Sequence, residues 1–161
     1  MKHRALDEVY CSVARTWSVL GDRWTMLVLR EAFRGTARYD GFQSRLQIGR
    51  TLLSERLNRL VDEGIFDRVR YSEKPERFEY KLTQKGLALY PAVVAIMRWG
   101  DEHLCDEGAP VVLRHTCGGV ADPVMVCSHC RAELDPHDVT PEPADAPPLA
   151  LAPIPATGGR A

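Results

Sequence analysis

The chain has 161 residues, of which 45% are hydrophobic and 27% charged, and its formal net charge is −1. This length suits one domain of ordinary size with an appendage. No apolar run approaches the roughly 18 residues of a membrane-spanning helix, and the polar N-terminus lacks the apolar centre of a secretory signal, so we expect a cytoplasmic protein without a membrane partner. Because the net charge is near zero, binding to nucleic acid would depend on a local basic cluster.

The first part of the chain predicts three helices. Apolar residues recur at helical spacing from Tyr10 to Leu20 and again from Trp24 to Phe33. Asp22 precedes the second helix and is a suitable N-cap. A shorter helix is expected from Asp40 to Leu46, and the turn after it falls at Ile48-Gly49.

The next segment predicts a fourth helix and a β-hairpin. The helix runs from about Arg50 to Glu63, and its apolar residues lie on one face, at Leu53, Leu57, Leu60 and Val61. After Gly64, the stretches Phe66–Tyr71 and Arg77–Leu82 alternate with a period of two around a turn at Glu73-Lys74-Pro75. Helix, turn, helix and hairpin in this order are typical of a winged helix-turn-helix.

Thr83 is a suitable cap for a further helix that is unusually rich in apolar residues. They cover more than one stripe, at Leu87, Leu89, Tyr90, Val93, Val94, Ile96, Met97 and Trp99. We interpret the surplus as a dimer interface. Pro91 lacks an N–H and crowds the preceding turn, so it should kink or restart this helix.

The sequence divides into three parts. Residues 1–107 are predicted to form a mainly α-helical domain with a small β-hairpin wing, which binds DNA and dimerises through terminal helices. Residues 108–135 are predicted to form a small β module that contains cysteines. Residues 136–161 hold seven of the eleven prolines and few aromatic residues, so we expect a disordered tail.

Several motifs in the correct order resemble one known family. They are Cys11-Ser12, Leu20-Gly21-Asp22-Arg23-Trp24-Thr25, Leu53-Ser54-Glu55-Arg56-Leu57, the stretch Pro75 to Thr83, and Gly86. With them the chain resembles the HxlR family of bacterial transcriptional regulators over about Cys11 to Trp99. The resemblance implies a winged-helix homodimer on a pseudo-palindromic operator in double-stranded DNA. We expect a repressor with no required cofactor, and an activator is the alternative. Gly49 stands where the family often has Ser or Thr, but glycine is an acceptable cap.

The basic residues around the fourth helix and the hairpin are the candidate DNA contacts. Between Arg45 and Lys85 there are ten basic and seven acidic residues. A recognition helix reads bases with its N-terminal part while the wing contacts the backbone. We expect base contacts from Arg50, Thr51, Ser54, Glu55 and Asn58. We expect phosphate contacts from Arg45, Arg56, Arg59, Arg68, Arg70, Lys74 and Arg77. The alternative for each is a solvated charge.

Cys11 opens the first helix close to Arg15, where the helix N-terminus and a cation favour a reactive thiolate. In HxlR-like regulators a cysteine at this place resembles the one that senses oxidants or electrophiles, and a small-molecule effector is a further possibility. The alternative is a half-buried cysteine that acts as a small hydrophobic residue.

The remaining cysteine motif predicts a metal site. Cys117, Cys127, Cys130 and His115 could bind a structural zinc ion in a small zinc ribbon, with His129 and His137 as rivals for the fourth ligand. Free thiols are the alternative. The spacing of Cys127 and Cys130 also leaves open a thiol oxidoreductase or a zinc-binding adaptor, although no βαβ unit precedes the motif.

Overall fold

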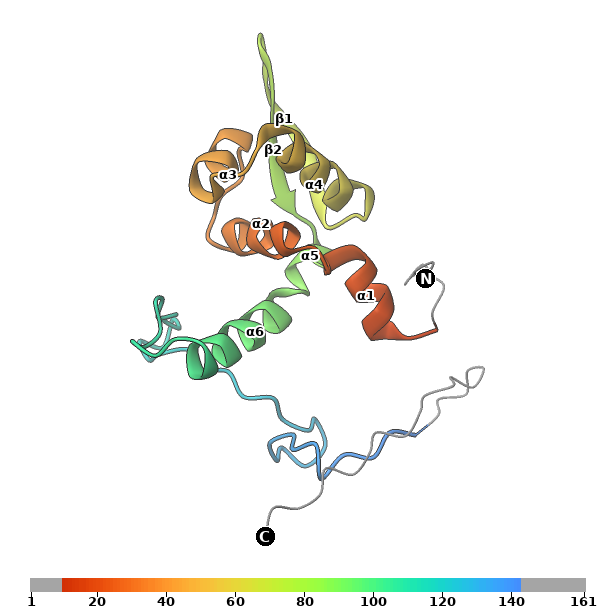
Figure 1. Cartoon of the computed structure of the whole chain (residues 1–161), viewed down its shortest axis with the longest axis vertical. Helices are drawn as coiled ribbons and strands as arrows, with labels where there is room; N and C mark the ends of the chain where they lie inside the picture. Colours follow the sequence, from red (N-terminus) through yellow and green to blue (C-terminus); the bar gives the residue numbers. More distant parts are fainter. Residues whose placement is uncertain (1–9, 143–161) are drawn as a thin grey trace.

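The computed structural model describes residues 10–142, and most of the predicted tail lies outside them. The elements follow each other as a helical domain with a projecting hairpin and a C-terminal arm (Figure 1). In chain order they are α1 Ser12–Leu20, α2 Arg23–Phe33, α3 Tyr39–Leu46, α4 Arg50–Asp62, β1 Phe66–Glu73, β2 Glu76–Leu82, α5 Gln84–Leu87 and α6 Tyr90–His103. Within the described part of the chain, no helix is both long enough and apolar enough to cross a membrane.

The predicted N-cap of α2 is confirmed. The Asp22 carboxylate accepts hydrogen bonds from the backbone N–H groups of Trp24 and Thr25, at 2.9 and 3.2 Å. These two N–H groups have no partner inside the helix, so the side chain satisfies them and fixes the point where α2 begins. The C-terminal end of α4 also has a clear local cause. Two residues after α4 ends, Gly64 adopts a φ of +66°, a conformation that a residue with a Cβ atom rarely adopts.

The hydrophobic core joins α2, α3, α4 and the start of the hairpin. Its members are fully or nearly fully buried: Leu20, Val28, Leu29, Phe42, Leu46, Ile48, Leu53, Leu57, Leu60, Ile65, Phe66 and Tyr80. The rings of Phe42 and Phe66 pack with their centroids 6.3 Å apart, and Phe66 also contacts Tyr80. The apolar face predicted for α4 is therefore buried, and its opposite face is left free.

The hairpin is antiparallel, with Phe66 opposite Leu82 at its base and Glu73 opposite Glu76 at its tip. The segment before α3 joins it, because the Tyr80 N–H donates to the Ala37 carbonyl at 2.7 Å and Arg38 forms a bridge with Glu79. The wing is thus attached to the helix-turn-helix at its base. The predicted mainly helical winged helix-turn-helix with a two-stranded wing is confirmed.

The predicted helix after Thr83 is interrupted, as Pro91 indicated. The short helix α5 is capped by the Thr83 hydroxyl, which accepts from the Gly86 N–H at 3.1 Å. The helix α6 then begins at Tyr90 with Pro91 in its first turn, where a missing N–H costs nothing. Gly86 packs so closely that a Cβ atom there would lie 2.3 Å from the Ile65 carbonyl oxygen.

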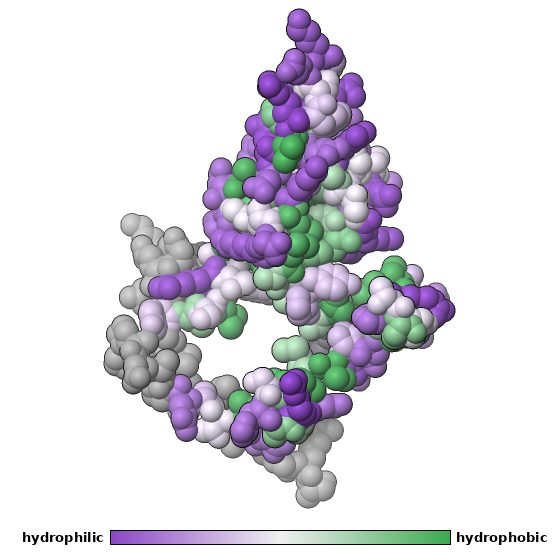
Figure 2. All heavy atoms as spheres, turned by 180° about the vertical axis from the view of Figure 1, so that it is seen from behind, coloured by the Kyte–Doolittle hydropathy of each residue, from purple (hydrophilic) through white to green (hydrophobic). Residues whose placement is uncertain are grey.

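After α6 the chain forms an extended segment, residues 105–142, which we call the arm. Two tight turns within it are each closed by a single bridge, Arg114 with Val120 and Val126 with Glu133. Seen from behind, hydrophilic residues cover the wing, and hydrophobic residues are exposed around the opening between the helical domain and the arm (Figure 2). The predicted β module is therefore present only as these two bridged turns.

Candidate DNA-binding surface

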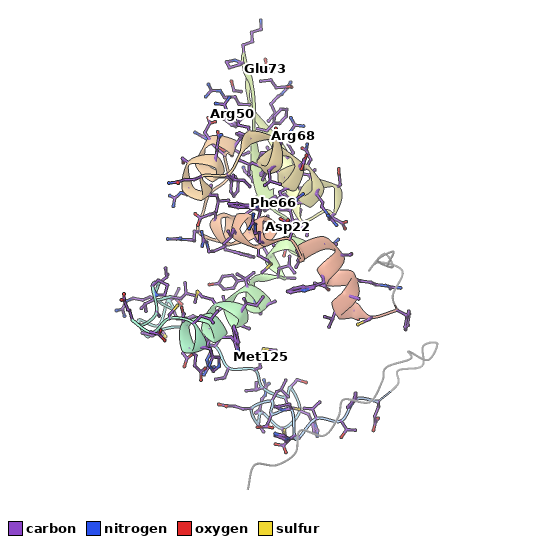
Figure 3. All side chains as sticks on the ribbon, in the orientation of Figure 1. Asp22, Arg50, Phe66, Arg68, Glu73 and Met125 are labelled. Atoms are coloured by element: carbon purple, nitrogen blue, oxygen red, sulfur yellow. The ribbon has the colours of Figure 1, made fainter. Side chains whose placement is uncertain are left out.

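The polar face of α4 is the centre of the candidate site. Arg50, Thr51, Glu55 and Asn58 are exposed on it, and Ser54 is half-buried. Arg50 opens the helix at the end from which the wing projects, and Arg68 and Glu73 lie along the wing beside it (Figure 3). The predicted base-reading residues thus share one outward face next to the hairpin, which is the arrangement that a recognition helix and a wing require.

Tyr39 holds the first turn of α4 and was not predicted from the sequence. Its hydroxyl donates to the Arg50 carbonyl oxygen at 2.9 Å and accepts from the Ser54 hydroxyl at 3.4 Å. The N-cap residue of α4 is Gly49, which offers no side-chain cap. A tyrosine on α3 therefore fixes the turn that carries Arg50. In the sequence, this role was indicated only by the position of Tyr39 at the start of the preceding helix.

Arg56 lies on α4 but binds inside the protein. Its guanidinium forms a two-pronged ion pair with Asp22, with Nε–Oδ1 at 2.9 Å and Nη2–Oδ2 at 3.2 Å. Burial by itself would raise the pKa of Asp22, but hydrogen bonds from Arg56 and from the N–H groups of Thr25 and Trp24 outweigh it and lower that pKa. Arg56, predicted as a phosphate contact, joins α4 to the start of α2.

Two other arginines predicted as phosphate contacts also have partners within the protein. Arg59 donates to the Ser18 carbonyl oxygen of α1. Arg45 lies 3.7 Å from the carboxylate of Glu31, which is 2% exposed and also pairs with Arg30 and Arg34. These contacts hold α1, α2 and α3 in place around α4.

On the wing, the four predicted phosphate contacts are all exposed: Arg68, Arg70, Lys74 and Arg77. The Arg68 guanidinium lies 3.7 Å from the ring centroid of Phe78, and Arg70 pairs with Glu73 and Glu76 near the tip. Such exposed pairs are weak, so Arg70 can exchange its carboxylates for phosphates. Lys74 lies in the turn at the tip.

Arg38 was missed by the sequence analysis and connects α3 to the wing. Its guanidinium pairs with Glu79 at 3.0 Å and lies 4.5 Å from the Tyr71 ring centroid. The hydrogen bond from Arg38, with help from Lys81, lowers the pKa of Glu79 against a smaller opposing effect of burial. Arg38 therefore links the start of α3 to both strands of the wing.

Cys11 immediately precedes α1 and is half-buried as a free thiol. Its carbonyl oxygen accepts the first hydrogen bond of the helix, from the Arg15 N–H at 3.0 Å. The Arg15 guanidinium lies over the Tyr10 ring, 5.3 Å from its centroid. The predicted sensor is thus at a helix N-terminus, as expected, and its reactivity stays a prediction.

The predicted zinc ligands fall in the two turns of the arm. Hydrogen bonds from the backbone N–H of Cys130, from that of His129 and from the Cys130 thiol lower the pKa of Cys127. In the other turn, the His115 ring accepts from the Cys117 N–H at 3.3 Å. Between residues 10 and 142 no three His, Cys, Asp or Glu side chains gather closely enough to hold a metal ion. The residues as placed do not form a complete site, and zinc stays a prediction.

Known proteins resemble this chain along most of its length. The uncharacterised HTH-type transcriptional regulator Rv3095 of Mycobacterium tuberculosis is 52% identical over 145 residues, which cover 89% of this chain and 90% of the relative. The crystal structure of PA1607 matches with a TM-score of 0.78 and 33% identity, over 86% of this chain and 99% of PA1607. The reduced form of the redox regulator HypR matches with a TM-score of 0.54 and 29% identity, over 57% of this chain and 92% of HypR.

The family model described as HxlR-like helix-turn-helix matches residues 19–107, which contain the exposed face of α4, the wing and all of α6. The match agrees with the geometry of α4 and the wing, and with relatives that are transcriptional regulators. It also argues against a thiol oxidoreductase, because this family consists of transcriptional regulators and not of enzymes. The chain therefore belongs to the HxlR family of helix-turn-helix transcriptional regulators.

Proposed function

We propose that this regulator binds a pseudo-palindromic operator as a homodimer and represses the genes beside it. Each copy would insert α4 into the major groove and rest its wing on the adjacent backbone. Bound in this way, a dimer obstructs access of the transcription machinery to the duplex. DNA is the expected partner, in keeping with the family.

The observation that carries the proposal is the exposed polar face of α4 at the root of the wing. Arg50 can donate two hydrogen bonds to a guanine, and Glu55 can accept from a cytosine amino group. Lys74 and Arg77 extend the positive charge along the hairpin, where they can meet phosphates. Specific side chains on the helix and non-specific cations on the wing are what sequence-specific binding needs.

The homodimer is supported by apolar side chains that the chain leaves exposed on its terminal helices. On α1, Val13 and Trp17 are 71% and 50% exposed, and on α6, Ile96 and Trp99 are 48% and 57% exposed. On each helix the two side chains are about one turn apart, and exposed apolar side chains grouped in this way favour an interface. Because α1 and α6 lie on the side away from the wing (Figure 1), two copies joined there can present both α4 helices to one duplex.

A selection of genomic fragments by the purified protein tests this proposal. The retained fragments should share an inverted repeat whose half-sites are one helical turn apart, about 34–36 Å. Sedimentation of the complex should give two chains per duplex, and the affinity should fall steeply with added salt. Retention of fragments without a common sequence, or no salt-dependent binding to any duplex, would contradict it.

We also propose that Cys11 makes DNA binding sensitive to oxidants or electrophiles. Its place before α1 and the redox regulator HypR among the structural neighbours support this. Operator affinity measured before and after diamide should change for the natural protein and stay constant for Cys11→Ser. The variant keeps the other four cysteines, so an equal response of both proteins would assign the effect elsewhere and end the proposal.

A further inference from the structure

The arm exposes more apolar surface than its own fold can cover. None of its residues is buried. The large apolar side chains between 37% and 62% exposed are Val111, Val112, Val120, Val124, Met125, Val126, Leu134 and Val139. Scattered apolar residues are normal on a surface, but a folded strip that carries so many of them and has no core marks an interaction site.

This segment nevertheless has a defined local structure. Leu134 donates its N–H to the Met125 carbonyl at 2.9 Å, and the Ala121 N–H donates to the Leu113 carbonyl at 2.8 Å. On α6, Arg98 pairs with Asp122 at 3.3 Å and donates to the Pro123 carbonyl at 2.6 Å. The arm is therefore an ordered strip attached to α6 at one point.

A pocket of about 250 Å³ lies on the other side of the helical domain, beside α1. Val19, Leu20, Ile65 and Leu89 give it an apolar lining, and Arg15 and Lys85 add two cations. No ion pair with a carboxylate is found for either cation among residues 10–142. Lys85 donates only to a backbone carbonyl, that of Glu63. The pocket thus suits an occupant that is apolar and negatively charged.

The arm has this chemistry. It carries seven Asp and Glu against two Arg, and its apolar run from Val124 to Val126 begins two residues after Asp122. The chain's own arm does not reach the pocket, because every lining residue belongs to α1, α5 or the residues Ile65 and Leu89. It leaves from the far end of α6 and is held there by Arg98 (Figure 1).

We propose that the arm of each chain docks in the pocket beside α1 of a second copy. This inference rests on the homodimer proposed above and adds to it an exchange of arms outside the contact between the terminal helices. The apolar run of the arm covers Val19 and Leu89, and its carboxylates approach Arg15 and Lys85. In this position the arm contacts α1, the helix that follows Cys11 and whose Ser18 carbonyl oxygen accepts from Arg59 of α4.

Photo-cross-linking in the full-length protein tests this exchange. Benzoylphenylalanine replaces Met125, tagged and untagged chains are mixed and allowed to exchange, and the linked peptides are identified by mass spectrometry. The expected result is a link between two chains, from the arm of one to residues 12–20 or 85–89 of the other. Charge reversal by Lys85→Glu should lower the yield by roughly threefold or more, whereas Lys74→Glu on the wing should not change it.

Other outcomes separate this inference from the homodimer. Sedimentation of the same samples reports whether the chains are paired. Dimers whose links stay within one chain, or reach another surface of the partner, would overturn the arm exchange and leave the homodimer intact. Monomers would overturn both. Should Lys85→Glu lose its helical circular dichroism, Arg15→Glu provides the same charge reversal at the exposed side of the pocket.

Discussion

Replacing Asp22 with alanine should destabilise the fold by about 2 kcal/mol, because this carboxylate has two separate tasks. It caps α2 through two backbone N–H groups, which is worth about 1 kcal/mol. It also forms the two-pronged pair with Arg56. Charge-assisted bonds of this type contribute more than neutral ones, but the two side chains are 31% and 21% exposed. With that solvent screening, we assign about 1 kcal/mol to the pair.

The variant Asp22→Asn separates the two tasks, since asparagine caps a helix as well as aspartate does but carries no charge. It should lose about half of the effect, roughly 1 kcal/mol. The lowered pKa of Asp22 gives a second signature. The advantage of the natural protein over Asp22→Asn should be complete above about pH 4, the ordinary range of an unfolded aspartate, and should vanish as the pH falls through the lowered native pKa.

Urea unfolding followed by circular dichroism measures these differences, at one fixed protein concentration because a dimer is more stable when concentrated. A double-mutant cycle of Asp22→Ala with Arg56→Ala should give a coupling of about 1 kcal/mol. A coupling indistinguishable from zero would show that the ion pair does not join α4 to α2. Equal losses for Asp22→Asn and Asp22→Ala would refute the contribution assigned to the cap.

Three further predictions concern DNA binding, and anisotropy titrations with operator and scrambled duplexes check all of them. Arg50→Ala should weaken operator binding by about 1–3 kcal/mol and relax the preference for one base, and an unchanged preference would remove Arg50 from the reading set. Lys74→Ala should weaken all duplexes equally and reduce the salt slope by about 1, so a loss confined to the operator would contradict a phosphate contact. Tyr39→Phe should lower operator affinity without changing base preference, because the first turn of α4 loses its clamp. Its control is Tyr71→Phe, which keeps its ring beneath Arg38, and equal affinities of the two variants would count against the clamp.

The sequence was sufficient for the helices and the wing. Hydrophobic periodicity placed α2, α3 and α4 to within one residue at each end, because the core is built from those periodic positions. The break before α6 was also predictable, since proline disrupts a helix interior but is tolerated in the first turn, where Pro91 lies. Local chemistry decides both features, and local chemistry is visible in a sequence.

The sequence did not predict which arginines bind inside the protein and which stay free to contact DNA. Arg56 and Arg59 carry the same charge as Arg50, but their partners, Asp22 and Ser18, are 34 and 41 residues away in the sequence. The position of each arginine around α4 was a partial indication, because Arg56 lies beside the buried apolar face whereas Arg50 is the first residue of the helix. Arg38 also acts through a distant partner, because Glu79 is 41 residues away, whereas the partners of Tyr39 are 11 and 15 residues away but on another helix. Which cations remain free for DNA depends on the tertiary structure.

Those internal arginines give α1 a physical route to the reading surface. Arg59 is bound to the end of α1 and Arg56 to the residue that starts α2, so the junction between these helices is tied to α4 at two points. A shift of α1 caused by a modified Cys11 or by a rearranged dimer must therefore move α4 or break these contacts. Two contacts of about 1 kcal/mol each match the roughly 1–3 kcal/mol that typically couples two sites. If α1 responds to Cys11 as proposed, bonds of this strength would suffice to couple that response to α4.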